Sequence, residues 1–319
     1  MVDTFCESSV LPLNYINVSD DVLLSDFDKV TWVKMIKLLS PNEFIYEPLQ
    51  FVRLHSTNEL NNRNEKVITK SAVSTGTASH ENVERSLENA LIECIQMDSY
   101  NLWWYGGYAG KDISIDVQEF MNSYFKNGMD EFFSKFEVKF TDISFDKSIW
   151  VIVCEIIGKN NQRPRYTVGV QGAYDRNRAI YRSFMETLAV LSYSINLSWL
   201  SPESLVKSSE HIGKMNNLDK NVAYYVVHDK PDINHRAFTK WNTSKVNNLE
   251  TLIYSMSNLL KWCGYLNITP NEFDGMSVNV SRIVAPMLLP VALPSFPPKK
   301  HPRYMELGGI INNVEHPMA

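Results

Sequence analysis

The spacing of apolar and polar residues predicts a chain of mixed helices and strands. Apolar residues recur at helical intervals over 21–40, 82–98 and 175–198, which indicates amphipathic helices. The apolar run 148–157 predicts a strand that lies at the centre of a sheet. The same reasoning predicts helices over 115–136 (interrupted at Gly128) and 245–264, strands over 51–56, 137–143, 166–171, 221–227 and 277–284, a polar loop over 57–67 and a turn over 160–165. This mixture predicts an α+β (mixed α/β) fold.

One strand–turn–helix pattern occurs twice along the chain. Gly76 is followed by a helical stretch that reaches Glu93, and Gly169 is followed, at the same spacing, by a helical stretch that reaches Glu186. Internal repeats are informative because they reveal duplicated building blocks. We therefore expect two repeated strand-loop-helix units with internal pseudo-symmetry. Their helices should lie on the same side of one sheet, with Glu93 and Glu186 facing one cleft.

Each repeat helix carries a narrow polar stripe on a helical wheel. The stripe has two interpretations that the spacing leaves open. Carboxylates and amides at i, i+3 and i+4 can bind Mg²⁺ through oxygen while arginines pair with phosphate. Alternatively, the stripe is a solvated helix face with local ion pairs. The stripe residues are Arg85, Asn89, Glu93 and Gln96 in the first helix and Arg178, Arg182 and Glu186 in the second.

Composition narrows the class of protein. A chain of 319 residues with 44% hydrophobic residues can form a sizeable core, and its net charge of −5 predicts no nucleic-acid partner. The longest apolar run, 283–294, is broken by three prolines and is too short to span a bilayer, so no membrane association is expected. The four cysteines form no C-x-x-C pair, which favours a reducing, cytoplasmic location.

Two motifs resemble those of a known family. The sequence S-T-G-T-A-S-H at 74–80, followed by L-E-N-A-L-I-E-x-x-Q-M-D at 87–98, resembles the central motif of the YcaO family. That motif reads roughly S-N-G-x-A-x-G and then E-A-x-x-x-A-L-x-E-x-x-E-R-D. The second repeat resembles the later YcaO helix that carries a glutamate, and S-R-I-V-A-P at 281–286 resembles the family's late strand. The resemblance covers about residues 40–300 and is nearest to the azole-forming, microcin-type cyclodehydratases.

The resemblance implies a chemistry, cofactors and a site. YcaO proteins use ATP and Mg²⁺ to phosphorylate the oxygen of a peptide backbone amide after a nucleophile has attacked it. A Cys, Ser or Thr side chain gives an azoline, and sulfide gives a thioamide. By resemblance, Glu93 and Glu186 are the metal ligands. The full ATP- and Mg²⁺-binding set implied by the resemblance is Ser74, Glu93, Gln96, Arg182, Glu186 and Arg282.

The sequence also departs from the family pattern. Gln96 replaces the second glutamate of E-x-x-E-R, Met97 replaces its arginine, and His80 replaces the second glycine. We find no upstream G-E-x-x-E-R motif, so we expect residues 1–319 to form a single YcaO-like domain that lacks the usual N-terminal motif. Residues from about 295 to 319 are expected to be an extended, proline-rich tail.

Three functions follow from these features. The first is the YcaO component of an ATP-dependent system that forms azolines in a ribosomally made peptide. The second is a degenerate YcaO-like scaffold that binds a peptide or partner without ATP turnover. The third is an α/β binding protein whose repeat helices only pack. The expected partners are a precursor peptide and either a subunit of the E1-like, leader-binding type or a second YcaO piece that completes the site.

Overall fold

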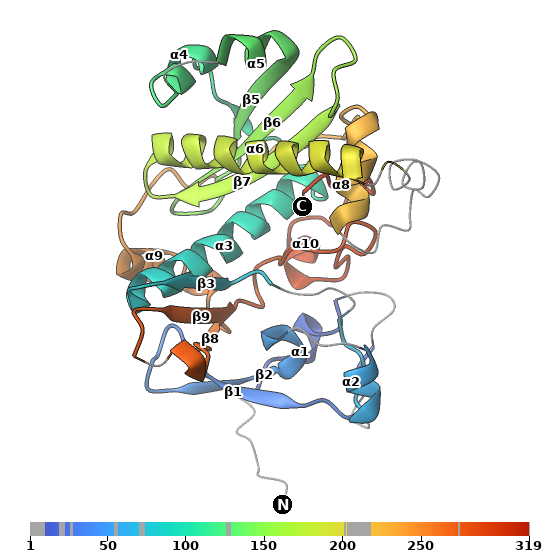
Figure 1. Ribbon diagram of the computed structural model, residues 1–319. Helices are drawn as coiled ribbons and strands as arrows, with labels where there is room; N and C mark the ends of the chain where they lie inside the picture. The colour runs from blue at the N-terminus through green and yellow to red at the C-terminus, as the bar shows by residue number, and fades with distance from the viewer. Residues whose placement is uncertain are drawn as a thin grey trace, which may run out of the picture. The chain divides into compact units, whose positions relative to one another are not determined.

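The chain forms two compact units. The computed structural model describes residues 10–18, 23–25, 28–53, 57–69, 74–125, 129–200, 202, 218–273 and 275–318. Unit 1 consists of Met1–Asn101, Val246–Ala292 and Phe296–Ile310, and unit 2 consists of Leu102–Lys245, Leu293–Ser295 and Ile311–Ala319. Each unit contains its own sheet and helices (Figure 1), so the predicted α+β class is confirmed.

Unit 1 is built on a five-stranded sheet in the order β2-β1-β8-β9-β3. Every neighbouring pair of strands is antiparallel. Strand β9 lies between β8 and β3, and Arg282 of β9 is in register with Thr77 of β3. The strands are β1 (Trp32–Lys37), β2 (Phe44–Pro48), β3 (Thr77–His80), β8 (Gly264–Asn267) and β9 (Asn279–Val284).

The long helix α3 (Val83–Trp104) contacts strands β9 and β3 of this sheet. Its Ser86 hydroxyl donates to Ser281 Oγ at 2.6 Å and lies 3.2 Å from the carbonyl oxygen of Ala78. These contacts join the first turns of α3 to β9 and β3, and they confirm the helix predicted over 82–98. Among the residues that the structure describes, the other helices of unit 1 are α1 (Leu49–Val52), α2 (Thr57–Asn62), α9 (Leu249–Ser255) and α10 (Pro302–Glu306), with 3-10 turns at Leu13–Tyr15, Ser257–Leu259 and Asn271–Phe273.

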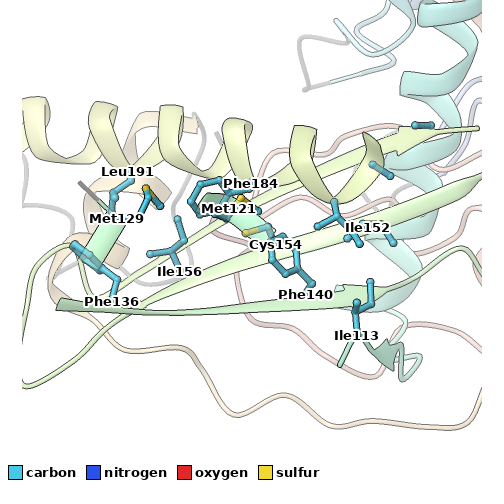
Figure 2. Close-up of a cluster of buried hydrophobic side chains, with 13 residues drawn as sticks. Ile113, Met121, Met129, Phe136, Phe140, Ile152, Cys154, Ile156, Phe184 and Leu191 are labelled. Atoms are coloured by element: carbon cyan, nitrogen blue, oxygen red, sulfur yellow. The ribbon is translucent and has the colours of Figure 1, made fainter. Parts of the chain in front are cut away.

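Unit 2 has a four-stranded antiparallel sheet in the order β4-β5-β6-β7. Helix α6 covers one face of the sheet (Figure 1). In Figure 2, Phe184 and Leu191 of α6 point toward Cys154 and Ile156 of β6. The elements are β4 (Lys111–Asp112), β5 (Phe136–Asp142), β6 (Trp150–Gly158), β7 (Tyr166–Ala173), α4 (Val117–Asn122), α5 (Met129–Lys135), α6 (Arg176–Leu200) and α8 (Leu218–Val227).

Strand β6 is buried over nearly its whole length, which confirms the central strand predicted from its apolar run. The strand predicted over 166–171 and the helix predicted over 175–198 are also confirmed. The predicted interruption at Gly128 lies outside the described residues, which place α4 and α5 on either side of it.

Several predicted elements are wrong. Residues 32–37 form strand β1 instead of a helix, because β2 and β8 supply backbone partners on both sides of it. Residues 221–227 belong to helix α8, where Val222, Tyr225 and Val226 are buried at helical spacing despite their strand propensity. The strand predicted at 51–56 overlaps the end of α1, and residues 54–56 lie outside the described residues. The loop predicted at 57–67 begins as α2, and the helix predicted at 245–264 is shortened to α9.

The repeat also differs from its prediction. Gly169 is an interior residue of β7, so it is not a loop glycine. The two repeat helices pack against different sheets, α3 against β3 and β9 and α6 against β6 and β7, instead of sharing one. What the repeats do share is an edge strand that is followed by a long helix. The pseudo-twofold between them stays a prediction.

The C-terminal segment contains more structure than an extended tail. Helix α10 begins after His301, whose Nδ1 accepts from the Arg303 N–H. Farther along, Trp104 Nε1 donates to the Val314 carbonyl at 2.7 Å, and the Tyr225 hydroxyl donates to the Glu315 carbonyl at 2.6 Å. None of the helices in the described residues has the length and apolar character needed to cross a membrane.

Candidate functional site

The turn before β3 places Gly76 in a position that only glycine fits well. Gly76 has a φ of +90°, in the left-handed region that disfavours residues with a Cβ. A Cβ added there would lie 2.4 Å from the Ile283 carbonyl oxygen and 2.8 Å from Cys94 Sγ. The turn therefore lies directly against β9 and α3.

Glu93 of α3 binds this turn through its carboxylate. The Gly76 N–H donates to Glu93 Oε2 at 2.9 Å. Burial raises the pKa of the half-buried Glu93 carboxyl, and the N–H groups of Gly76 and Thr77 and the charge of Arg282 oppose that shift. A carboxylate has about four lone-pair sites, so these contacts leave it able to accept further ligands.

Arg282 of β9 holds the opposite side of the same turn. Its Nη1 donates to the carbonyl oxygens of Ser74 and Thr75, at 3.0 and 2.5 Å. The same nitrogen donates to Thr77 Oγ1 at 2.9 Å, and Nη2 donates to the Phe51 carbonyl. The side chain is 1% exposed. Burial lowers the pKa of Arg282, and the nearby Cys94 and Glu93 partly offset the effect.

The rest of the α3 stripe is not a uniform polar surface. Arg85 is exposed and pairs with Glu88, whereas Gln96 is buried. Asp98 is fully buried and forms an ion pair with Arg303 at 3.0 Å. The predicted stripe therefore runs from a solvated first turn, through Glu93, to a buried polar end.

In unit 2, Glu186 lies on α6 and is half-buried. It accepts a hydrogen bond from the Gln171 side chain of β7. Burial, and then the charge of Arg178, lower the pKa of Arg182, while Glu186 opposes the shift. Arg178, Arg182 and Glu186 on α6 therefore interact through their charges. Gly169 is close to the same helix, because a Cβ there would lie 2.6 Å from the Thr187 backbone nitrogen.

The structure brings the predicted residues together in two groups. In unit 1, Glu93, Arg282 and Ser74 meet around the Gly76 turn, with Gln96 one turn farther along α3. In unit 2, Arg182 and Glu186 share one face of α6. Sequence reasoning missed Thr77 and Gln171. Both were detectable: Thr77 directly follows the predicted loop glycine, and Gln171 is the one side-chain amide in the predicted strand segment YTVGVQGA.

These donors suit a magnesium ion that arrives with phosphates. Within the described ranges, no group of three or more His, Cys, Asp and Glu side chains is gathered as a metal site. Mg²⁺ is usually held by one or two carboxylates together with substrate phosphates. Glu93 in unit 1 and Glu186 in unit 2 are each a half-buried carboxylate of the kind that can bind Mg²⁺ through oxygen.

The sequence matches one protein-family model over most of its length. The model is described as YcaO cyclodehydratase, ATP- and Mg²⁺-binding, and it matches residues 10–289. That range contains all of the predicted site residues. A search of curated proteins found no match.

Solved structures confirm the fold. A chain of the E. coli microcin synthetase McbBCD complex, solved without and with pro-MccB17 bound, is 18% identical with a TM-score of 0.55; the match covers 86% of this chain and 69% of that chain. A heterocyclase in complex with substrate and cofactor is 11% identical, with a TM-score of 0.58 and 87% and 38% of the two chains covered. The heterocyclase TruD is 16% identical, with a TM-score of 0.54 and coverage of 87% and 37%. This chain therefore spans less than half of the length of the two heterocyclases.

Proposed function

The chain belongs to the YcaO family of ATP- and Mg²⁺-binding cyclodehydratases, and from that premise we propose that it activates backbone amides in a ribosomally made peptide. The proposed product is an azoline formed from a Cys, Ser or Thr residue. Bound ATP and Mg²⁺ would supply the phosphoryl group that makes the amide oxygen a leaving group. The observation that carries the proposal is the Gly76 turn bound to the half-buried Glu93 carboxylate within the region that matches the family model.

We assign roles to the site residues on their chemistry. Glu93 and Glu186 are the proposed Mg²⁺ ligands, because both are half-buried carboxylates on long helices. Ser74, Gln96 and Arg182 are proposed to line the nucleotide. Arg282 belongs to the same site through the turn that it holds.

The proposed partners are a precursor peptide and a second subunit. The microcin synthetase relative is a McbBCD complex that was solved with pro-MccB17 bound. We propose by analogy that this chain works with a subunit of the E1-like, leader-binding type or with a second YcaO piece. The described cysteines, Cys94, Cys154 and Cys263, are buried free thiols, which supports a reducing location such as the cytoplasm.

ATP hydrolysis is the direct test of this function. The purified chain is assayed alone and with the products of neighbouring genes, with and without peptide. We expect little or no turnover by the chain alone, because Gln96 contributes no charge where the family has a second glutamate. Turnover should appear when a partner is added. Strong peptide-dependent turnover by the chain alone would show that the missing carboxylates are not needed.

Substitution of the proposed metal ligands sharpens the test. Glu93→Gln and Glu186→Gln should each reduce turnover in the active complex by about 10–100-fold or more. The loss of a group that only orients a metal ligand already costs about 10–100-fold. The matched control is Glu137→Gln, because Glu137 is an exposed residue of β5 paired with Lys139. Its turnover should be unchanged. Unchanged turnover in Glu93→Gln, with folding intact, would remove Glu93 from the site.

The second candidate function is a scaffold that binds peptide or partner without turnover. The replacement of a family glutamate by Gln96 favours it. This function predicts peptide or partner binding that does not depend on Mg²⁺ or ATP. Calorimetric titration with peptide, in the presence and absence of Mg²⁺–ATP, separates the two functions.

A further inference from the structure

The turn formed by Ser74–Thr77 is held by charged side chains on two sides. The carboxylate of Glu93 accepts from the turn's N–H side, at Gly76. The guanidinium of Arg282 donates to the turn's carbonyl side, at Ser74 and Thr75. Each charge meets the backbone groups of complementary polarity, so both contacts stabilise one conformation of the turn.

Neighbouring backbone contacts complete this arrangement. The Gly76 carbonyl accepts from the Ile283 N–H at 2.7 Å. The Thr75 hydroxyl accepts from the Val291 N–H at 3.2 Å. The turn is therefore tied to α3 by Glu93, to β9 by Arg282 and Ile283, and to the segment after β9 by Val291.

Arg282 is placed for this task instead of for direct contact with a ligand. Its side chain is 1% exposed. Both terminal nitrogens donate to protein oxygens, those of the turn and that of Phe51. The planar fork of arginine suits several oxygens at fixed positions, which lysine cannot reproduce with a single ammonium.

We infer that Arg282 is a positioning residue that supports nucleotide binding by fixing the Ser74–Thr77 turn, and through it Glu93, without touching the phosphates. The inference rests on the proposed function, in which Glu93 holds Mg²⁺. It changes the role that the resemblance implied for Arg282, from a group in the nucleotide site to a support behind it.

The test uses the charge-conserving variant Arg282→Lys in the full chain, with its partner where binding requires it. Amide hydrogen exchange of the protein without nucleotide should speed up by about tenfold or more at Gly76 and Thr77, because the turn loses its carbonyl-side contacts. Affinity for a non-hydrolysable ATP analogue with Mg²⁺ should fall by about 10-fold, the lower end of the range for groups that orient metal ligands.

A second variant tests whether the effect passes through the turn. Thr77→Val removes the Oγ1 acceptor of Arg282 and keeps a β-branched residue in β3. Because the two side chains share one contact, the affinity losses of Thr77→Val and Arg282→Lys should be non-additive in the double variant. Arg63→Lys, on a partly exposed arginine that pairs with Glu59, is the control and should change neither measurement.

The outcomes are distinguishable. Unchanged exchange at Gly76 and Thr77 in Arg282→Lys would overturn the inference. Additive affinity losses would also overturn it, because they would show that Arg282 acts on the nucleotide independently of the turn. If the unmodified protein binds no Mg²⁺–ATP with or without its partner, the proposed function fails, while the exchange experiment still decides whether Arg282 fixes the turn.

Discussion

Gly76 and Gly169 occupy equivalent positions in the two repeats, but glycine is needed at each for a different physical reason. In unit 1, Gly76 has a left-handed φ and lies against backbone and sulfur atoms of its neighbours. In unit 2, Gly169 lies within strand β7 and allows close approach of helix α6. The associated glutamates differ in the same way, because Glu93 binds backbone N–H groups and Glu186 binds a side-chain amide. A repeated sequence pattern therefore does not guarantee a repeated local structure.

Alanine substitutions of three glycines separate backbone strain from crowding. Gly76→Ala should reduce the free energy of unfolding by ~1–3 kcal/mol through backbone strain and by a further ~1–3 kcal/mol through overpacking. Gly169→Ala should show only the loss from overpacking, because the φ of Gly169 is not left-handed. Gly275→Ala should lose only the contribution from backbone strain, since Gly275 has a φ of +81° and no atom of the described residues lies within 4 Å of an added Cβ. Urea denaturation measures all three, and an equal loss at Gly76 and Gly169 would contradict this account.

Each unit contains a buried glutamate, and the two carboxylates lie in different surroundings. Glu155 of unit 2 accepts from the Tyr166 hydroxyl at 2.6 Å and pairs with Lys230 Nζ at 2.6 Å. Lys230→Met leaves that carboxylate buried without its cation, and breaking a buried pair costs ~3–5 kcal/mol. We expect a value at the lower end, because Lys230 is about one-third exposed and Tyr166 remains. Denaturant titration of Lys230→Met checks this, with Lys139→Met on the surface as control.

Glu47 of unit 1 is the contrasting case. It is fully buried, and neither carboxylate oxygen has a hydrogen-bond partner in the described structure. Burial raises the pKa of Glu47 well above its usual value. The folded state then binds more protons than the unfolded state, so stability should fall as pH rises above the unfolded pKa.

Substitutions at Glu47 test that contrast directly. Glu47→Met should stabilise the protein at neutral pH by ~1–3 kcal/mol, the cost of an unsatisfied buried polar group. Glu47→Gln should remove the pH dependence and keep the cost of burying a polar side chain. Thermal unfolding from pH 4 to 8 distinguishes these outcomes. Destabilisation of Glu47→Met throughout that range would show that the carboxyl has a favourable role.

The smallest expected effect concerns His301 of unit 1. Its Nε2 lies 2.8 Å from the Pro286 carbonyl oxygen, and burial lowers the pKa of His301 to about 4. The unfolded state binds the extra proton first, so stability should decrease as pH falls from about 6.5 toward 4. His301→Asn keeps an N-cap acceptor for α10 and cannot titrate. Its stability should therefore depend less on pH across that interval, and an unchanged slope would exclude His301 as the cause.

Long local patterns could be predicted from the sequence. The helix around Glu93, the helix around Glu186 and strand β6 were all correctly predicted, because each is a long run with clear periodicity. The S-T-G-T motif also drew attention to Gly76 and Glu93, although the hydrogen bond between them was not predicted and became visible only in the structure. These features depend on residues close in sequence, where a pattern carries the most information.

Tertiary structure decided the rest. The sequence predicted a helix where strand β1 forms and a strand where helix α8 forms. Both predictions failed because contacts with other elements override the local preference of these segments. The contact of Arg282 with Ser74 and Thr75, more than 200 residues away, depends on β9 pairing with β3. The sequence by itself determined which residues carry charge beside a glycine turn. Folding determined which backbone groups those charged side chains bind. A buried charge is costly unless it is hydrogen-bonded, so its partners are the polar groups that the fold places beside it.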